Sequence, residues 1–343
     1  MPSPALLRLD QGIHTPSPGI PARQVSNANV VADPSHVQSL TAALTGVEAS
    51  KQLAAWTAVD RHIKSEHKVI GIGSGSTVPY VVDRIISQGT ELNRERVFIP
   101  TGFQSKELIV KGGLRLGDVD QYPTIDVTID GADEVDAELN CIKGGGACHL
   151  REKVLAEAAE TFIVVADYRK KSKTLGSAWK QGIPIEVAPF AYAKLLQNLH
   201  RFGSPSATLR MAKMKAGPVV SDNGNFIIDA PFEEEYMKHP FELLSRIKML
   251  TGVVEVGLFC GMAKAAYFGE AVRFISHLLR PFSPKLGLHL QDGSVTVRLL
   301  DPSAPKDGTF PVRPTPIDKR LEFVDNSESP QTIASSSFPE RSG

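Results

Sequence analysis

The stretch at residues 124–167, "TIDVTIDGADEVDAELNCIKGGGACHLREKVLAEAAETFIVVAD", decides the fold class. It predicts an apolar strand at 124–133, a helix at 151–162 and a second apolar strand at 163–167. Strand, helix and strand in this order are typical of a parallel sheet whose crossover helices cover both faces. Parallel strands end at one common edge, where the ligands of such sheets bind. The loops that follow these strands are therefore the first candidates for chemistry.

The same alternation continues toward the amino terminus, and a different pattern begins at residue 183. Upstream we expect helices at 49–63, 78–89 and 105–113, a strand running into glycines at 68–77, and a strand at 96–100. Downstream we expect strands at 183–189, 207–213, 226–231 and 253–259, and helices at 192–202 and 239–250. Asn223-Gly224, in the segment "SDNGN", is a strong signal for a hairpin turn.

These patterns together predict an α/β protein. A Rossmann-like parallel-sheet catalytic domain would comprise residues 46–182 and 257–301, and a second, smaller α+β lobe would comprise residues 183–256, with a cleft between them. Residues 1–45 and 302–343 are rich in Pro and Ser and show little periodicity. We expect them to form a disordered N-terminal arm and a disordered C-terminal tail.

Composition narrows the class of protein further. The chain has 343 residues, with 38 basic and 38 acidic side chains and a formal net charge of zero, so bulk electrostatics do not suggest a nucleic-acid partner. Its three cysteines include no C-x-x-C pair, which favours a reducing compartment over a disulfide framework or a zinc ribbon. No stretch has the length and apolarity of a transmembrane helix or of a secretory signal. We expect a cytoplasmic protein without a membrane partner.

The segment "GIGSGST" at 71–77 lies between a predicted strand and a predicted helix. Glycine 75 lets backbone amides approach an anion, and Ser74, Ser76 and Thr77 add hydroxyl donors at the helix N-terminus. The segment lacks the last glycine of a dinucleotide fingerprint and the lysine of a Walker loop, so a terminal phosphate is the better ligand. A tight turn with hydroxyls that cap the helix is the structural alternative.

The segment "DGADE" places Asp130 at the end of the predicted strand, and Gly131 and Ala132 form a turn that can bring Asp133 back to the same side. Two nearby carboxylates can share a cation or several hydroxyl groups. No His or Cys partner supports a metal site, so we expect sugar hydroxyls to bind here, with a turn of solvated acids as the alternative. Three further acids are expected to be surface charges: Glu134, Asp136 and Glu138.

The segment "IKGGGACHLREK" at 142–153 carries the strongest catalytic signal. Lys143 precedes Gly144, Gly145 and Gly146, which sets a cation against a loop of free amides suited to a developing oxyanion. Glu152 lies at the start of the next helix, whose N-terminus favours the carboxylate form and keeps the group ready as a base. A carboxylate opposite a lysine is what proton transfer beside a carbonyl requires. We expect the neighbouring side chains of Arg151 and Lys153 to point elsewhere.

In this order, "GIGSGST", "IPTGFQS", "TIDGADEVD", "IKGGGA" with "REK", "IPIEV", "GPVVSDNGNFIID" and "DGSV" closely resemble ribose-5-phosphate isomerase of the A type, in its eukaryotic, fungal-like form. The resemblance covers roughly residues 49–300. It implies interconversion of ribose 5-phosphate and ribulose 5-phosphate through a cis-enediolate in the pentose phosphate pathway. It also implies that no metal or organic cofactor is needed and that the protein is a homodimer or a larger homo-oligomer.

The resemblance also assigns roles to residues. Glu152 matches the base, and Asp130, Asp133 and Lys143 match groups that hold the sugar and stabilise the oxyanion. Two lysines enter through the resemblance alone: Lys51 matches a phosphate-contacting lysine, and Lys170 matches a further substrate-binding lysine. The remaining substrate-binding positions are Ser74, Gly75, Ser76, Thr77, Gly131, Ala132, Gly144, Gly145 and Gly146.

Two departures from the family pattern stand out. The family commonly has a threonine just before the Arg/Gln-Glu-Lys triplet, where this chain has Leu150, which cannot cap a helix, so we expect His149 to supply the missing bond. The second departure is an atypical insertion at 270–290 between "YFG" and "QDGSV", which the family joins almost directly. We expect the fold to tolerate it, whether it is translated intron sequence or a lineage-specific loop.

Two other classes of protein remain as alternatives. A nucleotide-dependent oxidoreductase would need an acidic residue at the end of the second strand to hold a ribose, and "RVFIPTGFQ" has none. A catalytically idle sugar-phosphate-binding protein would lack part of the acid, base and lysine set, which this chain has complete.

Overall fold

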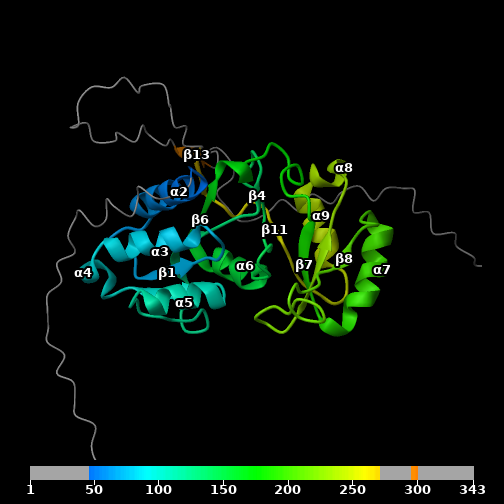
Figure 1. Ribbon diagram of the computed structural model, residues 1–343, viewed down its shortest axis with the longest axis horizontal. Helices are drawn as coiled ribbons and strands as arrows, with labels where there is room; N and C mark the ends of the chain where they lie inside the picture. Colours follow the sequence, from blue (N-terminus) through cyan, green and yellow to red (C-terminus); the bar gives the residue numbers. More distant parts are fainter. Residues whose placement is uncertain (1–45, 271–294, 300–343) are drawn as a thin grey trace, which may run out of the picture. The chain divides into compact units, whose positions relative to one another are not determined.

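The computed structural model describes residues 46–270 and 295–299. Its main sheet has six strands in the order β13-β12-β6-β3-β1-β2, all parallel except the edge strand β13. Figure 1 labels β13, β6 and β1 of this sheet. The strands are β1 (Val69–Ile72), β2 (Val97–Pro100), β3 (Ile125–Asp130), β6 (Ala159–Asp167), β12 (Ala265–Gly269) and β13 (Val295–Leu299). The chain passes from β1 to β2 on one side and then returns to β3 on the other. The switch point between β1 and β3 is where a ligand of such a sheet is expected.

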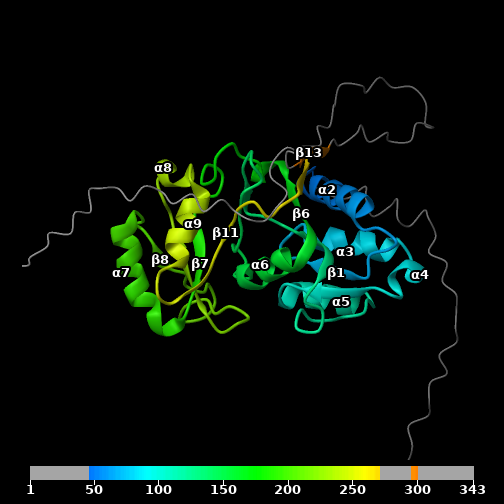
Figure 2. The same ribbon diagram turned by 180° about the vertical axis from the view of Figure 1, so that it is seen from behind.

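Helices cover both faces of this sheet, as predicted. On one face, α2 (Gly46–His62), α3 (Val78–Ser87) and α5 (Phe103–Lys111) pack on buried strand residues such as Ile70 and Ile129. On the other face, Leu155 of α6 (His149–Ala158) packs with Ile125. The two views in Figures 1 and 2 show α3 and α6 on opposite sides of the strands. The short helix α4 (Thr90–Asn93) follows α3.

The predicted helix at 151–162 is too long. Helix α6 ends at Ala158, and β6 begins at Ala159, which pairs with Ile125 of β3. Thr161 and Phe162 pair with the same strand. Pairing with β3 therefore overrides the helical pattern, because β-branched and aromatic residues pack well on a sheet.

The second sheet is antiparallel, in the order β10-β7-β9-β8. Its strands are β7 (Ile183–Val187), β8 (Thr208–Leu209), β9 (Phe226–Ala230) and β10 (Val253–Val256). Three α-helices accompany it: α7 (Tyr192–Phe202), α8 (Glu234–Met237) and α9 (Pro240–Lys248). The predicted strand at 207–213 shrinks to the two residues of β8. The turn at 221–225 is present, closed by a hydrogen bond from the Ser221 amide to the Asn225 carbonyl.

The predicted strand at 253–259 is split between two sheets. After β10 the chain passes Gly257, and β11 (Leu258–Phe259) joins a three-stranded sheet with β5 (Cys141–Ile142) and β4 (Glu134–Val135). The Gly257 amide donates to the Pro184 carbonyl at 2.7 Å, and its carbonyl accepts from the Lys143 amide at 2.9 Å. A Cβ at Gly257 would lie 2.2 Å from the Lys143 carbonyl oxygen. Glycine is required here because the chain changes sheets against another backbone.

The hairpin that closes the main sheet forms across the insertion. Gly269 of β12 pairs with Val295 of β13, and the pairing continues to Ala265 and Leu299. The predicted insertion lies outside the described residues apart from Glu270, as do the predicted arm at 1–45 and tail at 302–343. None of the helices in the described ranges is long and apolar enough to cross a membrane.

Candidate active site

The loops that follow β1, β3 and β6 meet the Lys-Gly-Gly-Gly segment at the carboxyl edge of the main sheet and line one cavity. Thirteen of the predicted site residues line it: Ser74, Gly75, Ser76, Thr77, Gly131, Ala132, Asp133, Lys143, Gly144, Gly145, Gly146, Glu152 and Lys170. Asp130 and Lys51 do not. A larger cavity of about 480 Å³, beside Trp179 and Phe232, contains none of the predicted site residues.

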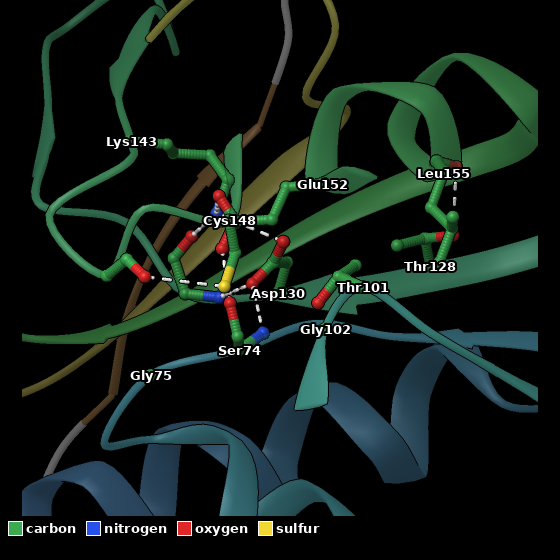
Figure 3. A network of polar contacts seen from close by, with 12 residues as sticks. Ser74, Gly75, Thr101, Gly102, Thr128, Asp130, Lys143, Cys148, Glu152 and Leu155 are labelled. Carbon is green, nitrogen blue, oxygen red and sulfur yellow. Dashed lines mark hydrogen bonds and ion pairs between the residues drawn. The ribbon is translucent and has the colours of Figure 1, made fainter. Parts of the chain in front are cut away.

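Asp130 lies directly beneath this cavity and is completely buried. Its Oδ1 accepts hydrogen bonds from the Ser74 amide at 2.9 Å and the Gly131 amide at 2.6 Å, and its Oδ2 lies 3.0 Å from Lys143 Nζ (Figure 3). A Cβ at Gly73 would lie 2.0 Å from Asp130 Oδ1, so only glycine allows this approach. The Asp130 carboxylate therefore holds three parts of the site together: the loop after β1, the turn after β3 and the Lys143 ammonium.

Lys143 is the buried cation of the site. Its Nζ donates to the Gly131 carbonyl at 2.5 Å and lies 3.0 Å from Asp130 Oδ2 and 3.2 Å from Glu152 Oε2. Burial by itself would lower the pKa of Lys143, but the charges of Asp130 and Glu152 outweigh it and raise the pKa above its ordinary value. The group is therefore an ammonium at neutral pH, and it is held against the cavity.

Glu152 lies in the first turn of α6 and reaches the same cluster. Its Oε1 accepts a hydrogen bond from Ser74 Oγ at 2.5 Å, and its Oε2 faces Lys143 (Figure 3). Burial and the charge of Asp130 raise the pKa of Glu152 to about 7, although Lys143 and Ser74 act in the opposite direction. The sequence predicts that the helix N-terminus keeps this group ionised, but burial and the Asp130 charge raise its pKa instead. Both protonation states are accessible near neutral pH, which suits a proton carrier.

Asp133 faces the cavity from the turn after β3. Its Oδ2 accepts from the Gly145 amide at 2.7 Å, which ties the turn to the Lys-Gly-Gly-Gly loop. Burial raises the pKa of Asp133. Its Oδ1 makes no hydrogen bond within the part of the chain that the structure describes, so an acceptor is available to a bound hydroxyl group.

The loop at 73–77 provides donors at the other end of the cavity. The amides of Ser76 and Thr77 donate no hydrogen bond to any described residue, and both residues line the cavity. The Gly75 amide donates to Gln104 Oε1 at 2.8 Å. The Ser74 hydroxyl, expected to bind phosphate, donates to Glu152 instead. Within this loop, the amides without an acceptor among the described residues that also line the cavity are therefore those of Ser76 and Thr77.

The two lysines inferred by resemblance have different places. Lys170 lines the cavity, and its Nζ lies 5.4 Å from the centre of the Trp179 ring. Lys51, in α2, is nearly buried and forms an ion pair of 2.7 Å with Glu48, outside the cavity lining. The structure therefore brings Lys170, but not Lys51, together with the other predicted residues.

Comparisons with known proteins identify the family. Residues 97–272 match the sequence profile of ribose 5-phosphate isomerase A (phosphoriboisomerase A). The chain is 70% identical over 263 residues to a ribose-5-phosphate isomerase of Cryptococcus neoformans, covering 74% of this chain and 80% of the relative. It belongs to the ribose 5-phosphate isomerase A family. The Schizosaccharomyces pombe ribose-5-phosphate isomerase is 53% identical over 257 residues, covering 74% of this chain and 85% of the relative.

Solved structures of the family agree with this fold. Ribose 5-phosphate isomerase from Plasmodium falciparum matches with a TM-score of 0.62 and 32% identity, over 74% of this chain and 98% of that one. A D-ribose-5-phosphate isomerase in complex with phospho-erythronic acid matches with a TM-score of 0.60 and 38% identity, over 65% of this chain and 95% of that one. The α/β fold and the resemblance inferred from the motifs are thus confirmed. Membership of this family excludes the alternative of a nucleotide-dependent oxidoreductase.

The departure from the family pattern at the start of α6 is not compensated by His149. The N-cap residue is Cys148, whose side chain makes no capping hydrogen bond, and the helix begins at His149. The imidazole is buried; its Nε2 lies 3.4 Å from the Glu255 carbonyl, and its Nδ1 has no partner among the described residues. Burial lowers the pKa of His149 to about 3, so the ring is neutral. The expectation that it caps the helix is wrong.

Two acids expected at the surface are buried. Glu134 is fully buried, and its carboxylate accepts hydrogen bonds from the backbone amides of Gly176, Ser177, Ala178 and Trp179. Asp136 is also buried and accepts from Asn140. Only Glu138 is exposed as expected. A carboxylate that satisfies the amides of a distant loop cannot be recognised from its own neighbours in sequence.

Sequence reasoning missed Arg210, which follows β8. Its guanidinium forms an ion pair with Asp229, and its Nη1 donates to the carbonyls of Gly144 at 2.9 Å and Gly145 at 3.1 Å. Arg210 thus fixes the loop that carries Lys143. No local signal could reveal this role, because the Gly144 and Gly145 carbonyls lie more than 60 positions away along the chain. Arg151 and Lys153 point away from the cavity, as expected, toward Asn223 and Glu255 respectively.

Proposed function

We propose that this protein interconverts D-ribose 5-phosphate and D-ribulose 5-phosphate in the non-oxidative branch of the pentose phosphate pathway. One observation carries the proposal. The Glu152 carboxyl group, with its pKa raised to about 7, lies beside the Lys143 ammonium in a cavity that ends at the free amides of Ser76 and Thr77. A proton carrier, an oxyanion partner and an anion-binding loop are the parts that isomerisation of a sugar phosphate requires.

In the proposed reaction Glu152 removes the proton from C2 of the open-chain aldose. The electron pair of the broken C–H bond forms the C1–C2 double bond, and the carbonyl π electrons move to O1, which gives a cis-enediolate. Lys143 stabilises the negative charge on this oxygen. Glu152 then returns the proton to C1, while the hydroxyl proton of O2 passes to O1, which leaves the ketose. Asp133 would hold the sugar hydroxyls, and Asp130 would keep Lys143 and the Ser74 amide in place.

The phosphate would bind at the other end of the cavity. The Ser76 and Thr77 amides and hydroxyls offer donors at the start of α3, and Lys170 adds a cation. We retain Lys51 as a phosphate-contacting residue on the strength of the family resemblance. Its contact would require the ammonium to leave Glu48.

Four further features belong to the same proposal. We infer a homodimer or larger homo-oligomer in the cytoplasm, and turnover without a metal or organic cofactor. We also assign the cavity to a catalytic domain of residues 46–182 and 257–301, with residues 183–256 as a smaller lobe. Sedimentation of the purified protein at assay concentration measures its oligomeric state. A mass equal to that of one chain would contradict the inferred oligomer.

The proposed function has a direct test. Purified protein is mixed with ribose 5-phosphate in the presence of a chelator, and ribulose 5-phosphate is followed. We expect turnover, and we expect Glu152→Gln to lower kcat about 10³-fold while binding of phospho-erythronic acid stays within about three-fold, because the shape is kept and the base is lost. Wild-type protein that binds this acid without turnover would instead indicate an idle sugar-phosphate-binding protein.

A further inference from the structure

The turn at 221–225 of the second sheet lies against the catalytic loops of the main sheet. It is built around Glu186 of β7, which is completely buried. Glu186 Oε1 accepts hydrogen bonds from Ser221 Oγ at 2.7 Å, Asn223 Nδ2 at 3.1 Å and Asn225 Nδ2 at 2.9 Å. The Gly224 amide donates to the Ser221 carbonyl at 2.9 Å. A buried carboxylate with three side-chain donors makes this turn rigid.

From this rigid turn, the Asp222 carboxylate reaches the first amide of α5. Asp222 Oδ2 accepts from the Phe103 amide at 2.9 Å, across 119 positions of sequence. The N-cap residue of α5 is Gly102, which has no side chain with which to cap the helix. Asp222 therefore supplies, from the other sheet, the negative charge and the acceptor that a helix N-terminus favours.

The residue next to Phe103 holds the phosphate loop. Gln104 Oε1 accepts from the Gly75 amide at 2.8 Å, and Gln104 Nε2 donates to the Gly75 carbonyl at 3.4 Å. Gly75 has a φ of +104°, in the left-handed region, and the Ser76 and Thr77 amides follow it. One side chain thus holds both backbone groups of the residue that turns the loop toward the cavity.

A third segment, the start of α6, also lies near Gly102 and Asp222. A Cβ at Gly102 would lie 3.1 Å from Asp222 Oδ2 and 3.0 Å from Cys148 Sγ, so the loop after β2, the turn and the start of α6 meet there. Figure 3 shows Cys148 beside Ser74 and Glu152. The start of α6 has a second contact with the turn, since Arg151 Nε donates to Asn223 Oδ1 at 3.0 Å. The turn therefore contacts both the helix that carries the base and the helix whose first residues hold the phosphate loop.

We propose that Asp222 is a positioning residue for phosphate recognition, acting through the Phe103 amide and the Gln104 side chain on Gly75. This inference rests on the proposed function for its substrate. A loop that is already ordered loses less conformational entropy when it binds an anion. Loss of the Asp222 acceptor lets the start of α5 fray, and Gln104 then no longer orders the loop. The effect falls on phosphate affinity and leaves the proton transfer at Glu152 intact.

The test compares four variants with the wild type. Asp222→Ala and Gln104→Ala should each raise KM for ribose 5-phosphate, and the Kd for inorganic phosphate measured by calorimetry, about five-fold, with kcat within two-fold. The double variant should be no worse than either single one, because both break the same chain of contacts. Asp222→Asn keeps an oxygen acceptor and should restore nearly wild-type values. Asp118→Ala is the matched control: its carboxylate accepts from the neighbouring Val119 amide and should change nothing.

Several outcomes would overturn the proposal. These are an unchanged phosphate affinity in Asp222→Ala, a loss confined to kcat, or effects of the two substitutions that multiply in the double variant. If Asp222→Ala does not fold, the other two variants still test the proposal. Gln104→Ala must weaken phosphate binding, and Asp222→Asn must leave it unchanged. The calorimetric Kd is independent of turnover. An inactive wild-type protein would refute the proposed function, but the effect of Asp222 on phosphate affinity could still be measured by calorimetry.

Discussion

At Glu152 two pairs of effects act on one carboxyl group. Burial and the Asp130 charge disfavour its ionised form, and Lys143 and the Ser74 hydroxyl favour it. One ammonium cannot neutralise two buried carboxylates fully, so the proton affinity of Glu152 rises. The result is a group that can both take and return a proton near neutral pH.

The pH dependence of turnover follows from this. The aldose-to-ketose step needs Glu152 ionised in the free enzyme, so kcat/KM should rise with pH and level off above an apparent pKa of about 7. The carboxylate of Glu152 is the reactive form, and protonation removes it as the pH falls below the raised pKa, so turnover decreases toward low pH. The measurement is kcat/KM for ribose 5-phosphate between pH 5 and 9. A profile already flat at pH 5.5 would show that the carboxyl group keeps an ordinary pKa.

Lys51 offers a second test at the scale of one side chain. If it contacts phosphate, Lys51→Ala should raise KM for ribose 5-phosphate about ten-fold and leave kcat within two-fold. Lys68→Ala is the matched control, because this exposed lysine precedes β1 and so lies at the opposite edge of the sheet. Equal KM values for the two variants would assign Lys51 to its ion pair with Glu48 alone.

At the scale of elements, buried carboxylates shape the loops between helices and strands. Glu134 of β4 holds the amides of residues 176–179, and the loop they form carries Trp179. The Trp179 ring in turn approaches the Lys-Gly-Gly-Gly loop, since a Cβ at Gly145 would lie 2.9 Å from it. An acid that looks like a surface charge in sequence thus holds a loop that packs against the Lys-Gly-Gly-Gly segment.

Glu134→Gln tests this arrangement. Its new amide group would point an N–H at backbone N–H donors, so we expect a loss of about 2–3 kcal/mol in the free energy of unfolding. Urea unfolding measures it. Glu138→Gln, at an exposed position, is the control and should change stability by less than about 0.5 kcal/mol. Equal midpoints for the two variants would mean that the buried acceptors can be replaced without cost.

At the scale of the whole molecule, the main sheet closes through a pairing that does not depend on a short connection. Residues 270–294 separate the paired residues Gly269 and Val295. Loop-closure entropy grows only slowly with length, so a long connection is compatible with the hairpin. The second sheet also contributes to the site from a distance in sequence, because Arg210, which follows β8, donates hydrogen bonds to the carbonyls of Gly144 and Gly145.

Deleting residues 271–290 tests how the hairpin depends on this connection. Five residues would remain between the strands: Glu270 and 291–294, with Asp292-Gly293 as a turn signal. We expect the hairpin to form, the free energy of unfolding to rise by about 1 kcal/mol, and kcat to stay within two-fold. Thermal unfolding and the isomerase assay measure both. A loss of activity in a folded deletion variant would give the segment a role in the site.

Much of the site was predictable because its chemistry lies in short segments. The alternation of strands and helices determined the α/β class, since periodicity is a local property. The glycine loop at 71–77, Asp130 and Asp133 were recognisable because they follow strands of a parallel sheet, and such strands end at one edge. Lys143 and Glu152 follow β5 of the small antiparallel sheet, and they were recognisable from the Lys-Gly-Gly-Gly segment and the helix that begins after it. The family motifs added Lys170, which lines the cavity.

Only the tertiary structure decided how these groups act. The pKa of Glu152 depends on burial and on Asp130, 22 positions earlier, and the Ser74 hydroxyl binds the base because the fold brings them together. Glu134, Arg210 and Asp222 act on loops that lie 42 to 119 positions away along the chain. Hydrogen bonding and desolvation depend on distance in space, so the sequence determined which groups are present, and the packing of the three sheets determined what each group does.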